Sequence, residues 1–259
     1  DEAVQKSDAS FVIVPTPSIK ETGFFSNSYV LKAMETLGKA LRKKKGYHLV
    51  VITSTVMPGS TDGEIRAALE SASGRKVGPD LGLCYNPEFI ALGSVVRDML
   101  YPDSILVGQA DQKAGDMLEK IYRQMCVKNP PVQRMNLVSA ELTKISVNTY
   151  VTTKISYANM LADLCDHLPG ADVDVVTKAL GADSRIGAKF LQAGPGFGGS
   201  CFQKDILNLV YLCGHYGLHE VAAYWQSVVE LNTWQQHRIA RLVVNRLFGT
   251  VTGKRIALL

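Results

Sequence analysis

Short apolar runs alternate with helical stretches over residues 1–137, and this alternation indicates the fold class. The apolar runs predict short strands at 11–14, 48–53, 81–85, 104–107 and 132–135. Between them, the spacing of apolar residues predicts helices near 26–45, 58–70 and 112–124. Strands that alternate with helices form βαβ units. This half of the chain therefore predicts an α/β fold with a mostly parallel sheet.

The pattern changes after about residue 137, where helical stretches follow one another. Ser139 is a reasonable N-cap for one long helix that runs to about His167. Further helices are expected near 172–180, 203–215 and 220–247, and a glycine-rich segment, 193–200, interrupts them. We therefore expect two units, an α/β unit followed by a mostly helical one.

Composition excludes several classes of protein. Hydrophobic residues make up 46% of the 259 residues and charged residues 20%, which is typical of a soluble globular chain. The net charge of +4 is too small and too dispersed to predict nucleic-acid binding. No apolar run approaches the ~20 residues that span a bilayer. The chain is therefore expected to bind neither nucleic acid nor membrane, and to act in the cytoplasm.

Cysteine and histidine spacing argues against metal sites and disulfides. The five cysteines are widely spaced and contain no CxxC pair, and the five histidines show no HExxH-like spacing. We predict reduced thiols and no metal site. The five cysteines are Cys84, Cys126, Cys165, Cys201 and Cys213.

The most unusual local sequence is the glycine-rich segment 194–205, which ends in Cys201-Phe-Gln-Lys-Asp205. Its glycines let the backbone approach a ligand closely. Cys201 would open a helix, where the helix dipole and free N–H groups favour the thiolate form. Asp205 would share a helix face with Cys201, and Lys204 would add positive charge. The segment fits an activated nucleophile as well as it fits a glycine-rich turn with a buried cysteine.

Two further sets of polar residues are candidates for a site. Lys144 and Asn148 stand four residues apart on the predicted long helix and share a face, although a solvated pair would have the same spacing. Thr16, Ser54-Thr55 and Glu88 follow three predicted strands, and ligands of open α/β sheets bind at the carboxyl ends of strands.

Together these residues resemble the UDP-glucose/GDP-mannose dehydrogenase family, most closely its UDP-glucose 6-dehydrogenase branch. The resemblance extends over essentially the whole chain, and the form Gly-Gly-Ser-Cys-Phe-Gln-Lys-Asp at 198–205 is its most specific motif. The other matching segments are Val14-Pro-Thr-Pro17, Ser54-Thr55-Val56, Asn86-Pro-Glu-Phe89, Glu141-Leu-Thr-Lys144 with Asn148, and Ser184-Arg-Ile-Gly187.

The resemblance implies NAD-dependent, four-electron oxidation of a nucleotide sugar at C6, by a homodimer or higher homo-oligomer. Cys201 would be the nucleophile that forms a thiohemiacetal and then a thioester. Lys144 and Asn148 would stabilise oxyanions, Asp205 and Thr55 would position water, and Glu88 would act as general base. Thr16, Ser54 and Lys204 would lie near NAD. The substrate would contact Phe89, Ile90, Arg185, Phe190, Leu191, Gly196, Phe197 and Gly198.

The resemblance also implies three parts. Residues 1–137 correspond to the C-terminal half of a Rossmann-like NAD-binding domain, 138–249 to a helical central and dimerisation domain, and 250–259 to the first strand of a nucleotide-sugar-binding domain. The family's strand–GxGxxG–helix fingerprint does not occur, and Leu92 stands where relatives often have a cofactor-binding Glu. We expect an internal fragment that is inactive alone.

Two other functions remain open. A GDP-mannose dehydrogenase would share the nucleophile and the two oxidation steps. A non-catalytic dimerisation module would use the long helix and the last helix as a dimer core, with a vestigial site. The joint presence of Cys201, Lys144, Asn148 and Asp205 argues against the module.

Overall fold

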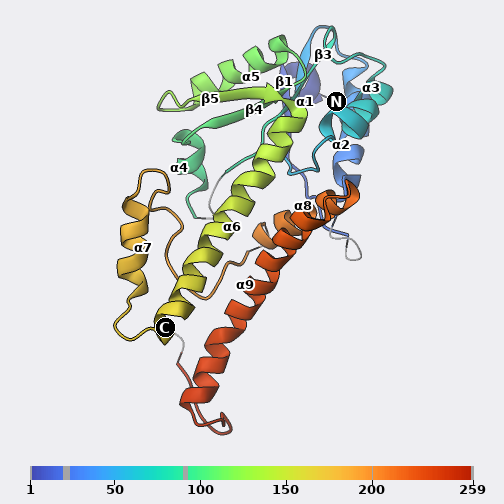
Figure 1. The fold of residues 1–259 in the computed structure, drawn as a ribbon. Coiled ribbons are helices and arrows are strands. Elements are labelled where there is room, and N and C mark those ends of the chain that lie inside the picture. Colours follow the sequence, from blue (N-terminus) through green and yellow to red (C-terminus); the bar gives the residue numbers. More distant parts are fainter. Residues whose placement is uncertain (1, 20–23, 90–92, 200, 258–259) are drawn as a thin grey trace. The chain divides into compact units, whose positions relative to one another are not determined.

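A computed structural model describes residues 2–19, 24–89, 93–199 and 201–257. The chain divides into two compact units, residues 1–146 (unit 1) and 147–259 (unit 2). Each unit is described by itself below, with the element labels of Figure 1.

Unit 1 is built on a five-stranded sheet with the strand order β1-β2-β3-β4-β5. All residues of β2 and β3 are buried, as expected for strands covered on both faces. The strands are β1 (Ala9–Val12), β2 (His48–Ile52), β3 (Leu81–Tyr85), β4 (Ile105–Gln109) and β5 (Val132–Asn136). The five predicted strands are therefore present, with β1 placed two residues earlier than predicted.

One pairing in this sheet is antiparallel. The pairs β1–β2, β2–β3 and β4–β5 are parallel, whereas β3 and β4 run in opposite directions. A parallel neighbour needs a crossover, usually through a helix of full length. In the described part of the connection from β3 to β4 (86–89 and 93–104), the one helix is the short α4 (Val95–Leu100), which the sequence did not predict. The sheet is thus mostly parallel, as predicted, but not fully so.

Helices cover both faces of the sheet and build two apolar clusters. On one face, α2 (Ser28–Leu41) and α3 (Arg66–Ser73) pack with Val50, Ile52 and Leu83. On the other face, α5 (Gln112–Met125) places Ala114 and Leu118 against Val51 and Val107. A short α1 (Glu2–Lys6) precedes β1. Unit 1 therefore has the layers of a doubly wound α/β fold.

The helix predicted at 58–70 forms differently. Residues 58–60 are a turn, the π-helix η1 spans Thr61–Ile65, and α3 continues to Ser73. Gly63 has the non-helical angles φ −90 and ψ −111, which break the regular helix there. A helical spacing of apolar residues could not reveal the break, because that spacing does not depend on the backbone angles of one residue.

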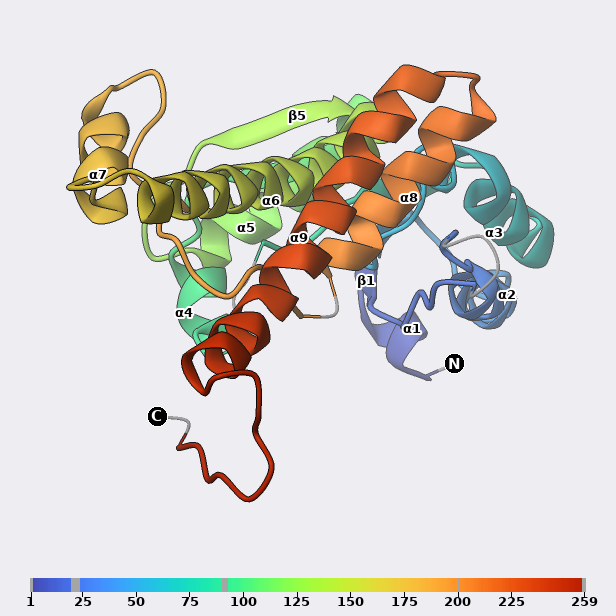
Figure 2. The ribbon, with the colours of Figure 1, turned by 60° about the horizontal axis from the view of Figure 1, so that its bottom comes forward.

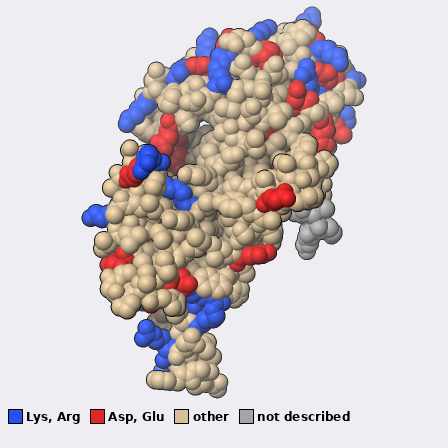
Figure 3. Space-filling model, viewed as in Figure 1, with Lys and Arg blue, Asp and Glu red and all other residues tan. Residues whose placement is uncertain are grey.

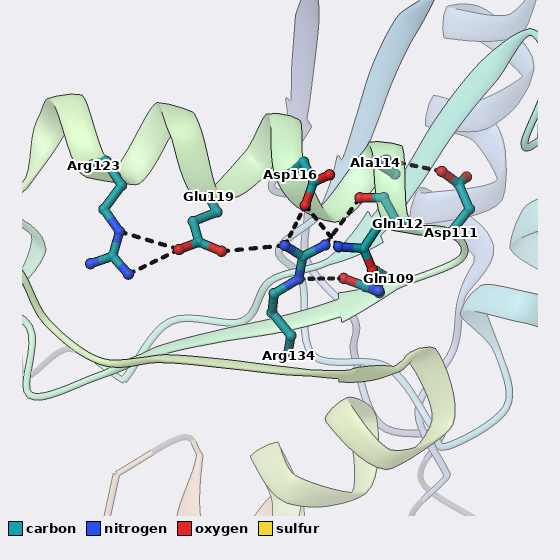
Figure 4. Close-up of polar contacts among 8 residues, drawn as sticks. All are labelled: Gln109, Asp111, Gln112, Ala114, Asp116, Glu119, Arg123 and Arg134. Carbon is teal, nitrogen blue, oxygen red and sulfur yellow. Dashed lines mark hydrogen bonds and ion pairs between the residues drawn. The ribbon is translucent and has the colours of Figure 1, made fainter.

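Helix α5 is attached to β5 by a cluster of charged side chains around Arg134 (Figure 4). The Arg134 guanidinium donates to Gln109 Oε1 at 2.7 Å and to the carbonyl oxygen of Gln112 at 3.0 Å. It also forms ion pairs with Asp116 at 2.5 Å and Glu119 at 3.3 Å. These contacts hold the edge strand β5 against α5 on one side of the sheet.

The long helix α6 (Leu137–His167) begins in unit 1 and continues into unit 2. The prediction of Ser139 as its N-cap is wrong, because the helix begins two residues earlier. The Asn136 side chain takes the capping role, since Asn136 Oδ1 accepts the Ser139 N–H at 2.8 Å. The C-terminal end at His167 is as predicted.

The rest of unit 2 is helical, as predicted. Helix α7 spans Val173–Ala182, α8 spans Phe202–His215 and α9 spans His219–Arg246. Helices α8 and α9 lie side by side, joined by a short connection (Figure 2). Phe197, Ile206 and Val228 form a buried apolar cluster with partly buried neighbours such as Phe202.

Residues 250–257 form turns and irregular chain, without the strand expected there. A strand is stable only when it pairs with another, and the part of unit 2 that the structure describes contains none. None of the helices in the described part of the chain is long and apolar enough to cross a bilayer.

Figure 3 shows one face of the molecule, on which basic and acidic side chains are interspersed. This arrangement agrees with the small net charge of +4.

Candidate active site

The residues predicted to carry chemistry fall into two groups. Thr16, Ser54, Thr55, Glu88 and Lys144 belong to unit 1. Asn148, Cys201, Lys204 and Asp205 belong to unit 2, together with the glycine-rich segment. Each group is built from its own unit, and helix α6 carries one residue of each, Lys144 and Asn148, four positions apart.

Lys144 lies against the loop that follows β3. Its Nζ donates to the carbonyl oxygen of Glu88 at 2.6 Å and stands 4.7 Å from the centre of the Phe89 ring. The structure therefore brings together two of the predicted residues, Lys144 and Glu88, although they are 56 positions apart in sequence. Lys144 contacts the backbone of Glu88, so the Glu88 carboxylate takes no part in this hydrogen bond. Ile90, also predicted to contact substrate, lies outside the described residues.

The start of this loop is fixed by Asn86, to which sequence reasoning assigned no role. Asn86 Nδ2 donates to the carbonyl oxygen of Leu106 at 2.8 Å, and the Tyr122 hydroxyl donates to Asn86 Oδ1 at 2.5 Å. Burial, helped by the negative charge of Glu88, raises the pKa of Tyr122 to about 12. The phenol therefore stays protonated and remains a donor to Asn86.

Polar residues follow β1 and β2 at neighbouring strand ends. The Ser54 hydroxyl accepts the N–H of Val14 at 2.8 Å and donates to the carbonyl oxygen of Val14 at 2.7 Å. Thr16 is buried and Thr55 half-buried. The structure thus brings these two segments together, and it uses the Ser54 hydroxyl to join their backbones.

Glu141 is a second residue of unit 1 that sequence reasoning did not assign to a role. Its fully buried carboxylate accepts the backbone N–H groups of Gly59 at 2.6 Å and Thr61 at 2.8 Å. Burial raises the pKa of Glu141, and these hydrogen bonds oppose the shift. Glu141 therefore ties α6, one turn before Lys144, to the loop that follows Thr55. The sequence signal for this role of Glu141 was a carboxylate on a helix face that is otherwise apolar.

In unit 2, Asn148 and Asp205 are in direct contact. Asn148 Nδ2 donates to Asp205 Oδ2 at 2.6 Å, although the two residues are 57 positions apart. Asp205 is 3% exposed, so its carboxylate is held in the interior near the start of α8. The structure thus pairs two residues that the sequence placed in one site only through resemblance.

Cys201 immediately precedes α8 and is exposed, whereas the alternative reading of this segment required a buried cysteine. Lys204, in the first turn of α8, is half-buried. Burial lowers the pKa of Lys204, while the nearby Asp205 and Cys201 act in the opposite direction. The accessible sulfur of Cys201 thus directly precedes α8, whose first turn carries the buried carboxylate of Asp205 and the partly buried ammonium of Lys204.

The predicted substrate contacts of unit 2 differ in exposure. Arg185 is exposed and forms an ion pair with Asp183 at 2.5 Å. Phe190 is exposed and has a positive φ of 64, which is uncommon for a bulky residue. Leu191 is buried. Phe197 is 4% exposed and packs in the apolar cluster, so its ring contributes to packing, and Gly196 and Gly198 flank it.

The glycines at 194, 196 and 199 have the letter spacing of a dinucleotide fingerprint, but their context differs. That fingerprint follows a strand directly. The described residues 183–199 contain no strand, so this segment is a loop before a helix and not a strand-to-helix turn.

Potential metal ligands are dispersed in the part of the chain that the structure describes. No group of three or more His, Cys, Asp or Glu side chains there is close enough to hold an ion.

Comparison with known proteins matches both units to one family. Residues 1–126 match the NAD binding domain of the UDP-glucose/GDP-mannose dehydrogenase family, and residues 138–234 match its central domain. UDP-glucose 6-dehydrogenase of Gallus gallus is 39% identical over all of this chain and 52% of its own length. The chain therefore spans about half the length of the curated relatives it matches.

Two solved structures extend the likeness to the fold. A UDP-glucose dehydrogenase from the hyperthermophilic archaeon Pyrobaculum islandicum has a TM-score of 0.87 at 36% identity, over 95% of this chain and 55% of that one. A GDP-mannose dehydrogenase from Pseudomonas aeruginosa has a TM-score of 0.67 at 30% identity, over 94% of this chain and 55% of that one.

Proposed function

Because this chain belongs to the UDP-glucose/GDP-mannose dehydrogenase family, we propose that its protein oxidises UDP-glucose at C6 to UDP-glucuronate with NAD. The observation that carries the proposal is the start of α8. There the exposed Cys201 precedes a buried Asp205 that is hydrogen-bonded to Asn148 at 2.6 Å. A non-catalytic module has no use for an accessible thiol beside a buried carboxylate–amide pair.

The residues of unit 1 fit part of a dinucleotide site. Polar residues follow three parallel strands, and open α/β sheets bind dinucleotides at that edge. Thr16 and the backbone of Ser54 would contact NAD, with Lys204 contributing charge. When bound, each NAD⁺ accepts one hydride, so a four-electron oxidation uses two. The GxGxxG spacing at 194–199 does not follow a strand, so it is not assigned to the pyrophosphate.

Cys201 would act as nucleophile after the first oxidation has converted the C6 alcohol to an aldehyde. The Cys201 thiolate forms a bond from sulfur to C6, and the carbonyl oxygen becomes the oxyanion of a thiohemiacetal. Loss of a second hydride from C6 gives a thioester. Water then adds to the thioester, the bond from C6 to sulfur breaks, and the thiolate is released with the carboxylate product.

The surrounding residues would stabilise charge and move protons. Lys144 and Asn148 would donate to the oxyanion, because they present an ammonium and an amide on one helix. Asp205 and Thr55 would position the hydrolytic water, and Glu88 would take its proton. The contact of Lys144 with the Glu88 backbone supports this assignment, since it keeps the ammonium beside the loop that carries the base.

The sugar nucleotide would be bound by the loops around these residues. Phe89, Ile90, Arg185, Phe190, Leu191, Gly196 and Gly198 are the proposed contacts. Phe197, whose ring is buried, would act through its backbone segment.

GDP-mannose is the alternative substrate. Both a UDP-glucose and a GDP-mannose dehydrogenase share this fold, but the former has the higher TM-score, 0.87 against 0.67. UDP-glucose is therefore the first substrate to test.

We expect the protein to form a homodimer through α6. Tyr150, Tyr157 and Leu164 are exposed at seven-residue spacing. Met160, between the last two, and Leu168, after them, are exposed as well. Such a stripe is typical of a helix that packs on a second helix, and two copies of one helix satisfy each other. A Tyr157→Glu variant should be monomeric by light scattering if the stripe is the interface.

The nucleophile is tested by comparing Cys201→Ser with Cys213→Ser in the full-length protein. Cys201→Ser should lose net formation of UDP-glucuronate, because serine is not acylated and released as readily as a thiolate. Cys213→Ser, which changes a buried thiol elsewhere in α8, should retain turnover. Comparable NADH yields from both variants would defeat the assignment. Asp205→Asn should slow hydrolysis of the thioester more than the first oxidation.

A further inference from the structure

The backbone before Cys201 is held by amide side chains from two helices of unit 2. Helix α9 carries Asn232, Gln235 and Gln236, of which the first two are buried, and α6 carries Asn159, also buried. Buried amides on helix faces that otherwise pack apolar residues require specific partners. Their partners are backbone groups of residues 194 and 197.

Asn232 binds Phe197 with both ends of its amide. Asn232 Oδ1 accepts the Phe197 N–H at 2.8 Å, and Asn232 Nδ2 donates to the Phe197 carbonyl oxygen at 2.9 Å. The side chain thus pairs with the loop as a neighbouring strand would. The Phe197 carbonyl also accepts from Gln236 Nε2 at 3.0 Å.

The glycine before Phe197 is required by this contact. Gly196 has a φ of 103, in the region that favours glycine, and a Cβ there would stand 2.6 Å from Asn232 Oδ1. Two residues earlier, Gly194 is held through its N–H by Asn159 Oδ1 at 2.8 Å and through its carbonyl by Gln235 Nε2 at 2.7 Å. The loop is therefore fixed at 194 and at 197.

The contact extends to the start of α8 through the side chain of Phe197. The Phe197 ring packs edge-on against Phe202, with ring centres 6.2 Å apart, and against Ile206 and Val228. Phe202 directly follows Cys201. Cys201 therefore lies between two anchored aromatic residues while its own side chain is exposed.

We infer that Asn232 is a positioning residue, which holds Phe197 through both backbone groups and so sets the place of the Cys201 thiol. Its effect on catalysis rests on the proposed function, whereas its effect on the loop does not. A side chain that only stabilised the fold would change thermal stability without changing the loop or the rate of the folded enzyme.

The test is Asn232→Ala in the full-length protein, with Gln226→Ala as matched control. Gln226 also presents an amide from α9, but its partner is Glu230 on the same helix. Hydrogen exchange should accelerate about tenfold or more at the amide of Phe197 in Asn232→Ala, with α9 unchanged. With UDP-glucose, kcat should fall about tenfold or more while KM changes less than about threefold.

Asn232→Asp and Gln236→Ala keep the experiment decisive if Asn232→Ala does not fold. Asn232→Asp retains the acceptor for the Phe197 N–H, and Gln236→Ala removes one of two donors to the Phe197 carbonyl. In both variants kcat should fall while KM changes little, and the fall should be smaller than in Asn232→Ala. Exchange and kcat equal to those of Gln226→Ala would overturn the inference. Wild type without NADH formation would defeat the proposed function, while faster loop exchange in Asn232→Ala would still support the positioning role.

Discussion

At the scale of single residues, the thiols of the chain differ in their surroundings. Cys201 is exposed, whereas Cys84 and Cys213 are buried. Burial raises the pKa of Cys84 to about 12 and also raises the pKa of Cys213. The thiolate is the reacting form, so burial suppresses both access and ionisation at these two positions.

Iodoacetamide at about pH 8 should therefore modify Cys201 before Cys84 and Cys213. With a pKa near 12, only about 10⁻⁴ of Cys84 would be thiolate at that pH. Peptide mass spectrometry over a time course measures each site in one sample. A rate at Cys84 or Cys213 equal to that at Cys201 would contradict the structure.

Sequence reasoning assigned roles to residues with reactive groups, but not to the residues that hold them in place. Cys201 and Asp205 could be identified as candidates from the unusual glycine-rich segment, and Lys144 and Asn148 through the resemblance to the family. Glu141 and Asn232 could not, since their roles depend on backbone groups 82 and 35 positions away. Periodicity reports which face of a helix is buried, and not which loop reaches that face.

Among the helices and strands, the close approach of β4 to α6 depends on Gly108. A Cβ at this position of β4 would stand 2.6 Å from Ala140 Cβ and 3.3 Å from the Leu137 Cα of α6. Neither neighbour is the end of a flexible side chain, so the strand and the helix would have to separate.

We expect Gly108→Ala to lower the free energy of unfolding by about 1–3 kcal/mol, the usual cost of overpacking. Gly214→Ala is the matched control, because a Cβ at this helical, exposed position meets nothing within 4 Å. The control should be more stable than wild type by about 0.5–1 kcal/mol. Urea unfolding of both variants measures the difference, and equal effects would refute the close packing of β4 on α6.

The link from α6 to the loop after Thr55 gives a second prediction. Glu141→Gln places an amide NH₂ against one of two backbone N–H donors, so it should cost about 1–3 kcal/mol of unfolding free energy. Glu2→Gln, at an exposed ion pair with Lys6, should change stability little.

The same residue sets a pH dependence. Because burial raises the pKa of Glu141 above its ordinary value of 4.5, the folded state holds more protons than the unfolded state between the two values. The unfolding free energy of wild type should therefore contain a component that falls as pH rises through this window, and Glu141→Gln should lack it. A component of opposite sign would show that the two backbone hydrogen bonds outweigh burial.

Element boundaries were less predictable than element types. The strands and long helices were identified from apolar spacing, and β3 was predicted to the residue. Apolar spacing did not predict the antiparallel direction of β4, the start of α6 at Leu137 or the irregular turn at Gly63. These features depend on a connection, a cap and a backbone angle, none of which leaves a periodic pattern.

In the whole molecule, an α/β unit and a helical unit both match one enzyme family. The chain spans about half the length of the relatives it matches, so the proposed activity is to be tested on the full-length protein. We propose that C6 is oxidised twice and that Cys201 holds this carbon covalently during the second oxidation.

The most direct measurement is the amount of NADH formed for each UDP-glucose consumed by the full-length protein, with GDP-mannose in parallel. We expect two NADH for each UDP-glucose and little turnover of GDP-mannose. Two NADH from GDP-mannose alone would retain the mechanism and change the substrate. One NADH for each sugar, or none from either, would contradict the thioester route through Cys201.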